Sequence, residues 1–313
     1  MIHLHILGGS GRIGSALTHF LNDHSRPEIK RVTIYCDSTK TKNITNSNPD
    51  LHFDAKPYSG FSIRSSSQDQ GSSQFRHVVL NLRGTNAKID WLNNPQDSLA
   101  LHTQSCQTIV HSDLWMQGKV EIIHFSSQLC DLIEGPNRLS EICQGQESYR
   151  RPYLVSRLHQ EAMLSAFAFQ HAIPTTFIRL AAVYGFQDDQ QSPWVLNNLI
   201  RQFRQTGKFD IRNPGNYIYL THRDALLSFV LSLVVNSLIA KRTQTLCYLH
   251  APMLKMKVSD LAELILKIHS NQAGLDREFF VSNFVDPSLA QSKDQELNFQ
   301  LLEKTISKLL DHD

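Results

Sequence analysis

Short apolar runs alternate with amphipathic stretches along the first half of the chain. Residues 2–7 and 32–36 are apolar runs of strand length, and the stretch between them has a helical pattern. The apolar positions of that pattern are Ile13, Ala16, Leu17, Phe20 and Leu21. Further strand-length runs occur at 78–82, 120–125 and 175–180. This alternation predicts an α/β fold of Rossmann type, with a doubly wound parallel sheet.

Helical patterns separate the later strands and continue beyond them. The two longest cover residues 95–115 and 153–171, and shorter ones cover 193–206, 258–270 and 296–310. Residues 38–75 give the weakest prediction. They include a ten-residue stretch without an apolar side chain, SSSQDQGSSQ, which is typical of an exposed loop.

Composition and charge exclude several classes of protein. A formal net charge of +2 over 313 residues gives no electrostatic reason to expect nucleic acid or an anionic membrane as a partner. No apolar run is long enough to span a membrane. The five cysteines form no CxxC pair, and the first residues enter a strand directly, without a signal sequence. We therefore expect reduced thiols and a cytoplasmic location.

A glycine-rich loop follows the first strand and precedes the first helix. Gly8 permits a sharp turn, Gly11 lets the backbone approach a pyrophosphate, and Gly14 lets helix and strand pack closely. Arg12 and Ile13 complete the loop, which places phosphates at the positive end of the helix dipole. The pattern predicts a dinucleotide site; the alternative is a glycine-rich turn in an unrelated α/β protein.

Asp37 follows the second strand and indicates which dinucleotide is bound. A carboxylate there suits a ribose diol and repels a 2′-phosphate, so NAD is favoured over NADP. Arg12, Lys40 and Lys42 lie close by in the sequence. Cations there would bind a 2′-phosphate, so NADP is the alternative cofactor.

Four further motifs and a closing helix follow this loop in a fixed order. They are residues 124–127 (HFSS), 153–161 (YLVSRLHQE), 179–185 (RLAAVYG), 221–225 (THRDA) and the helical stretch 293–310. Together with the loop, they resemble the extended short-chain dehydrogenase/reductase family, in its NAD-dependent epimerase/dehydratase group. The resemblance covers nearly the whole length. It implies a cofactor domain over 1–184, to which 216–250 return, and a substrate region over 185–215 and 251–313.

The resemblance also implies catalytic roles. Tyr153 would be the acid/base, Ser127 would orient the substrate oxygen, and Arg157 stands where the family has lysine. A phenol has an ordinary pKa of about 10 and needs a nearby cation to work at neutral pH. Tyr153 and Arg157 share a helix face because they are four residues apart. Arginine keeps the charge but not the shape of lysine, so the pair is either catalytic or a helix-start aromatic beside a solvated arginine.

Other departures from the family pattern concern the cofactor edge and the substrate. Residues 81–84 (NLRG), with Leu82 and Arg83, stand where the family usually has H-x-A-A beside the cofactor, so Arg83 is either a charge near the pyrophosphate or a solvated loop residue. Ala182 and Tyr217 occupy positions that contact a nucleotide diphosphate in nucleotide-sugar members. The candidate replacements for those contacts are Arg201, Arg204 and Arg212, which as surface cations would have no such role.

These features predict an NAD(P)-dependent oxidoreductase or epimerase that acts on a hydroxyl or keto carbon of a sugar-like substrate. A non-catalytic NAD(P)-binding relative and a reductase of small ketones remain as alternatives. We expect a homodimer joined by the helices at 95–115 and 153–171. No metal is expected, because His3 and His5 alternate on one strand face, a pattern more often due to packing than to ligation.

Overall fold

The chain, seen in a computed structural model, divides into two units. They are Met1–Arg179 with Leu231–His250, and Leu180–Val230 with Ala251–Asp313. The structure describes residues 1–24, 26–36, 51–58, 61, 75–84, 93–112, 120–133, 150–186, 195–211, 213–236, 245–269 and 293–311.

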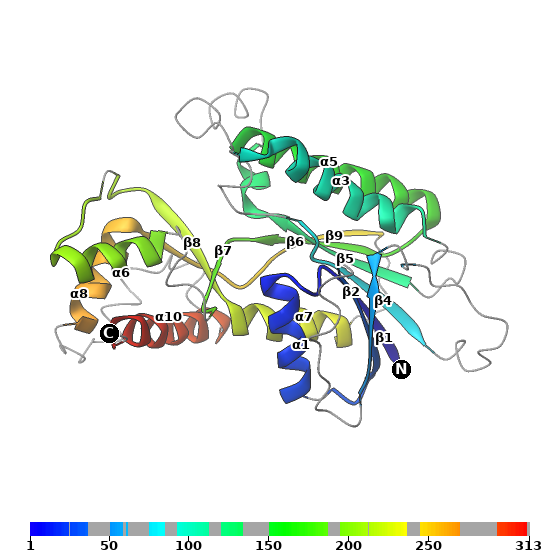
Figure 1. Cartoon of the computed structure of the whole chain (residues 1–313), viewed down its shortest axis with the longest axis horizontal. Helices are drawn as coiled ribbons and strands as arrows, with labels where there is room; N and C mark the ends of the chain where they lie inside the picture. Colours follow the sequence, from blue (N-terminus) through cyan, green and yellow to red (C-terminus); the bar gives the residue numbers. More distant parts are fainter. Residues whose placement is uncertain are drawn as a thin grey trace. The chain divides into compact units, whose positions relative to one another are not determined.

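The first unit is built on a seven-stranded sheet in the order β3-β2-β1-β4-β5-β6-β9 (Figure 1). Its strands are β1 (Ile2–Leu7), β2 (Ile29–Cys36), β3 (His52–Pro57), β4 (Arg76–Asn81), β5 (Val120–Ser127), β6 (Thr175–Leu180) and β9 (Leu246–His250). β1 pairs in parallel with β2 and with β4, so Leu4 lies opposite both Val32 and Val78. The strand order reverses between β1 and β4, which is the switch point where ligands bind in such sheets. The predicted Rossmann-type fold is confirmed.

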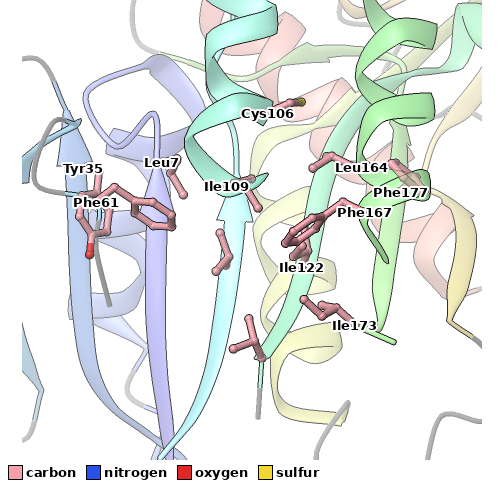
Figure 2. Packing of buried hydrophobic residues seen from close by; sticks show 12 residues of the cluster. Leu7, Tyr35, Phe61, Cys106, Ile109, Ile122, Leu164, Phe167, Ile173 and Phe177 are labelled. Atoms are coloured by element: carbon pink, nitrogen blue, oxygen red, sulfur yellow. The ribbon is translucent and has the colours of Figure 1, made fainter. Parts of the chain in front are cut away.

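Helices pack on both faces of this sheet. α3 (Pro95–Val110) and α5 (Arg150–His171) lie side by side on one face, and α1 (Arg12–Asp23) lies on the other (Figure 1). Apolar side chains fill the space between the sheet and the α3–α5 layer (Figure 2). They include Leu7, Ile122 and Phe177 from the strands and Ile109, Leu164 and Phe167 from the helices.

Element ends depart from the sequence predictions in two places. The helix expected over 95–115 ends at Val110, and its last turn closes where the Ser112 amide donates to the Ile109 carbonyl. α5 begins at Arg150, three residues before Tyr153. β3 was not predicted because it is an edge strand with mostly exposed or half-buried residues, and it lacks the apolar run of a central strand.

The second unit has its own sheet, in the order β10-β8-β7. Its elements are β7 (Ala182–Tyr184), α6 (Val195–Thr206), β8 (Tyr217–His222), β10 (Leu254–Lys257), α8 (Val258–His269) and α10 (Lys293–Asp311). An apolar core joins this sheet to the three helices. The predicted division placed 180–184 and 216–230 with the cofactor domain; in the structure they lie in this unit, where β7 and β8 pair with each other.

Helix α10 is fastened to the small sheet by one buried asparagine. The Asn298 side-chain oxygen accepts from the His222 backbone amide at 3.0 Å, and the Asn298 carbonyl accepts from the Tyr184 hydroxyl at 3.0 Å. α7 (Arg223–Asn236) begins in this unit and ends in the first. Among the helices that the structure describes, none is both long and apolar enough to cross a bilayer.

Candidate active site

The glycine loop at the carboxyl end of β1 is shaped by backbone contacts that only glycine allows. Gly8 has a φ of +92°, and a Cβ there would lie 2.8 Å from the Arg83 amide nitrogen. A Cβ on Gly14 would lie 2.3 Å from the Gly8 carbonyl oxygen. Gly11 caps α1 without any side-chain hydrogen bond, which leaves the first turn of the helix open to an anion. Arg12 is the exposed first residue of α1.

These contacts fit the pyrophosphate of a dinucleotide. The backbone can approach a ligand closely at Gly8 and Gly11, and the helix N-terminus supplies amide donors and a favourable dipole. Ile13 is half-buried in the first turn of α1. Asp37, on which the preference for NAD over NADP depends, lies outside the described residues, as do Lys40 and Lys42, so that preference stays a prediction.

Leu82 and Arg83 form the wall of this loop on the β4 side. The Leu82 amide donates to the Leu7 carbonyl, which continues the sheet to the edge of Gly8. The Arg83 guanidinium lies over the Tyr58 ring, 3.8 Å from its centroid, and donates to the Gln104 side chain at 3.0 Å. Arg83 is buried, so the prediction of a solvated loop residue is wrong. Its side-chain contacts go to protein groups.

Tyr153 and Arg157 lie one turn apart on α5, as their spacing predicts. The Arg157 guanidinium carbon is 5.3 Å from the centroid of the Tyr153 ring. Arg157 is 5% exposed and donates to the Phe125 carbonyl of β5 at 3.2 Å. The alternative of a solvated arginine is therefore wrong, because the charge is held inside the unit against the strand that ends at Ser127.

A second contact fixes the arginine from the side of α3. The Arg157 guanidinium donates to the Gln160 side-chain oxygen at 3.1 Å, and the Gln160 amide nitrogen donates to the His102 carbonyl and the Ser105 hydroxyl. Gln160 is fully buried. An amide with all these partners has one orientation, so its oxygen faces the guanidinium.

His102 lies between this network and the cofactor edge. Its Nδ1 bonds the Ser156 hydroxyl at 2.9 Å, and that hydroxyl donates to the Tyr153 carbonyl at 2.6 Å. A Cβ on Gly84 would lie 2.8 Å from the His102 Nε2 and 3.4 Å from an Arg157 nitrogen. Gly84 thus leaves room beside both groups, at the end of the segment that follows β4.

The two serines at the end of β5 have different surroundings. Ser126 donates to the buried Glu161 carboxylate, which also receives two bonds from Arg179 of β6. Ser127 accepts from the Leu129 amide at 3.3 Å, at the start of η5 (Gln128–Ile133). Because the Ser126 hydroxyl already donates to Glu161, the geometry favours Ser127 as the serine that orients the substrate oxygen.

The predicted substrate residues that the structure describes in the second unit have different surroundings. Arg201 and Arg204 line a cavity of about 380 Å³ with Asn197, Ile200, Gln205 and Leu309. Arg201 donates to Asn198, and Arg204 donates to the Leu309 carbonyl. Ala182 packs on the apolar core, and Arg212 lies outside the described residues.

Tyr217 has a partner that sequence reasoning missed. It begins β8 and is 54% exposed, and the Lys255 amine lies 4.8 Å from the centroid of its ring. Lys255 belongs to β10, which pairs antiparallel with β8. Gln160 and His102 were missed for a similar reason, since each gains its role from a neighbour more than fifty residues away.

Three solved structures illustrate the likeness of the fold. The Bordetella bronchiseptica enzyme WbmF in complex with NAD+ is 15% identical, with 99% of this chain and 96% of that chain covered and a TM-score of 0.62. UDP-N-acetylglucosamine 4-epimerase from Methanobrevibacter ruminantium M1 is 16% identical, with 99% of both chains covered and a TM-score of 0.63. TunA, an NAD dependent-NDP-hexosamine 5,6-dehydratase, is 17% identical, with 87% and 82% covered and a TM-score of 0.55.

Sequence comparison identifies the family. A comparison with curated proteins gave no match. A family model described as the NAD dependent epimerase/dehydratase family matches residues 4–227, which include the glycine loop, Ser127 and the Tyr153–Arg157 pair. The chain belongs to the NAD dependent epimerase/dehydratase family.

Proposed function

We propose that this chain is an NAD-dependent oxidoreductase or epimerase that acts on a hydroxyl or keto carbon of a sugar-like substrate. The observation that carries the proposal is the Tyr153–Arg157 pair, in which a buried cation is anchored to β5 beside the phenol. The glycine loop supports NAD, because its Gly8 and Gly14 positions admit no side chain.

Each residue of the pair has a distinct task in this chemistry. A nicotinamide cofactor held at the glycine loop would supply the hydride exchange with the substrate carbon. Tyr153 takes up or returns the proton of the substrate oxygen, and the Arg157 charge stabilises the negative charge that develops on the phenol oxygen. Ser127 donates a hydrogen bond that orients the substrate oxygen. Gln160 and the Phe125 carbonyl hold the guanidinium in place throughout.

Replacing Arg157 with lysine tests whether the pair is catalytic. We expect Arg157→Lys to keep or raise kcat, because the charge remains at the position where the family has lysine. We expect unfolding to become easier by about 1 kcal/mol, because a flexible amine holds the Phe125 carbonyl and the Gln160 oxygen less rigidly than the planar guanidinium, one nitrogen of which bonds both. Steady-state kinetics and denaturant unfolding measure the two effects.

A neutral variant gives the matching control. Arg157→Met should lower kcat strongly, and full activity in that variant would show that Arg157 has no part in catalysis. Cofactor binding, followed by calorimetry, shows whether each variant still holds NAD.

The substrate class is a nucleotide sugar in this proposal. The similar structures include UDP-galactose 4-epimerase and the UDP-N-acetylglucosamine 4-epimerase in complex with UDP-N-acetylmuramic acid. Ala182 offers no polar group at a position where family members contact a diphosphate. A small ketone, which has no diphosphate, is therefore the second candidate substrate class. Lys255 supplies a cation next to Tyr217, at the other such position.

A thermal-shift panel of UDP-, GDP-, CDP- and dTDP-sugars with NAD present tests this substrate class. We expect one nucleotide series to stabilise the protein, and Lys255→Ala to weaken its binding by about 10–100-fold, since a charge-assisted hydrogen bond contributes about 1.5–3 kcal/mol. Lys208→Ala, which removes an exposed lysine of the same unit, is the control. Arg201→Ala tests the predicted alternative. Stabilisation that survives both Lys255→Ala and Arg201→Ala would contradict these anchors.

We also propose a homodimer through the outer face of α3 and α5. Leu99, Val155 and Phe169 are 43%, 45% and 66% exposed there, whereas Ile109 and Leu164 point into the core. Light scattering at micromolar concentration should report a dimer, and the double variant Leu99→Asp/Phe169→Asp a monomer. Leu266→Asp, at an exposed leucine of α8, should leave the dimer intact. A monomeric wild-type protein would refute the interface.

A further inference from the structure

Three histidines meet on one face of the large sheet, at neighbouring strands. His3 and His5 lie on β1, and His77 lies on β4 directly opposite His3. All three are buried, at 9%, 1% and 4% exposure. One ligand atom from each lies within 4.8 Å of those of the other two. Strand pairing thus unites side chains that the sequence separates by more than seventy residues.

Hydrogen bonds orient the His3 and His5 rings in the manner of metal ligands. His3 Nε2 is 2.8 Å from the Thr33 hydroxyl, and His5 Nδ1 is 3.4 Å from the Tyr35 hydroxyl. A metal-bound histidine usually bonds a polar group through its other ring nitrogen, and Thr33 and Tyr35 are placed to accept such bonds. That leaves His3 Nδ1 and His5 Nε2 as candidate ligand atoms.

The spacing of the rings suits a small divalent ion. His5 Nε2 and His77 Nδ1 lie 3.0 Å apart. Two nitrogens on a tetrahedral zinc, each about 2.0–2.1 Å from the metal, lie roughly 3.3 Å apart, so a small shift admits the ion. All three rings are buried, and burial favours the neutral imidazole, which is the form that binds a metal.

We propose that His3, His5 and His77 bind one divalent transition-metal ion, with Zn²⁺ as the preferred ion, and that this ion fastens β4 to β1. Imidazole nitrogens suit zinc, and three of them leave one position of a tetrahedral site for water or another oxygen. The histidines lie toward the amino end of β1, whereas the glycine loop follows its carboxyl end. The ion is therefore structural, and it revises the sequence expectation that the chain has no metal site.

The decisive experiment is zinc binding by the full chain. Protein treated with EDTA and then dialysed against micromolar Zn²⁺ should retain one zinc per chain by elemental analysis, and its unfolding midpoint should rise with added zinc. Co²⁺ in place of zinc should give the visible absorption of a tetrahedral nitrogen site. A wild-type chain that retains no zinc and gives no such absorption overturns the proposal, whatever the variants do.

Variants then assign the site among the fifteen histidines of the chain. His5→Gln and His77→Gln should lose the bound zinc. Thr33→Val should weaken zinc binding by about 10–100-fold, as expected for a residue that orients a ligand. His159→Gln, at an exposed histidine of α5, should still bind one zinc. Retention of full stoichiometry in both His5→Gln and His77→Gln would show that exposed histidines bind the ion, and would also overturn the proposal.

Discussion

Replacing Tyr153 with phenylalanine is expected to lower kcat by about 10²–10⁴-fold, the usual contribution of a positioned acid or base. The change removes one hydroxyl and keeps the ring that faces Arg157 and His102. NAD affinity should stay nearly constant, because the glycine loop and the start of α1 are untouched. The loss should therefore fall on the proton transfer alone. Steady-state kinetics on a substrate found in the nucleotide-sugar panel, with calorimetry for NAD, measure both quantities.

Tyr248→Phe is the matched control for this prediction. Tyr248 lies on β9, stacks on Phe177 and is 47% exposed, so losing its hydroxyl should change neither kcat nor NAD affinity. Turnover that persists in Tyr153→Phe would remove Tyr153 from the mechanism. Loss of NAD binding in the same variant would instead indicate that the hydroxyl holds the cofactor.

Gly14→Ala is expected to abolish NAD binding at micromolar concentrations. A Cβ at this position would lie 2.3 Å from the Gly8 carbonyl oxygen and 2.6 Å from the Gly9 Cα. Because these are backbone atoms, the helix must move away from the strand. The amides at the start of the helix then no longer point at the pyrophosphate. Losing two charge-assisted hydrogen bonds of about 1.5–3 kcal/mol each weakens binding by roughly 100-fold or more.

Gly215→Ala separates this effect from a general intolerance of alanine. A Cβ at Gly215 would meet no heavy atom within 4 Å, so the variant should bind NAD like the wild type. Calorimetric titration with NAD and circular dichroism on both variants complete the comparison. A folded Gly14→Ala protein with unchanged NAD affinity would contradict the assignment of this loop to the cofactor.

The sequence predicted those parts of the fold that depend on local pattern. β1 is an apolar run bounded by glycine, and α1 repeats its apolar residues at helical spacing, so both were found with little error. The small sheet was not found. β7 has only three residues and β8 begins with half-exposed ones, so neither shows a buried run, and their identity depends on pairing with each other.

The candidate site, too, was predicted only where it depends on local sequence. The spacing of Tyr153 and Arg157 fixes their shared helix face, because a helix turn is a local property. The surroundings of Arg157 are not local: the Phe125 carbonyl comes from β5, and Gln160 is held by α3. Arg83 illustrates the limit most clearly. Its backbone packs against Gly8, as a residue beside the cofactor loop should, while its charge lies over Tyr58, which no sequence spacing connects to it.

The anchoring of Arg157 has a consequence for how this chain can evolve. Two buried acceptors, the Phe125 carbonyl and the Gln160 oxygen, now depend on one guanidinium. A lysine at this position would bond both acceptors from a single nitrogen, as one guanidinium nitrogen does here, whereas a change at Gln160 would disturb its bonds to His102 and Ser105. Exchange of arginine for lysine therefore needs one substitution, whereas a change at Gln160 needs accompanying changes on α3. Position 157 can thus vary between arginine and lysine by single steps, whereas Gln160, which bonds residues of two helices, will vary more slowly.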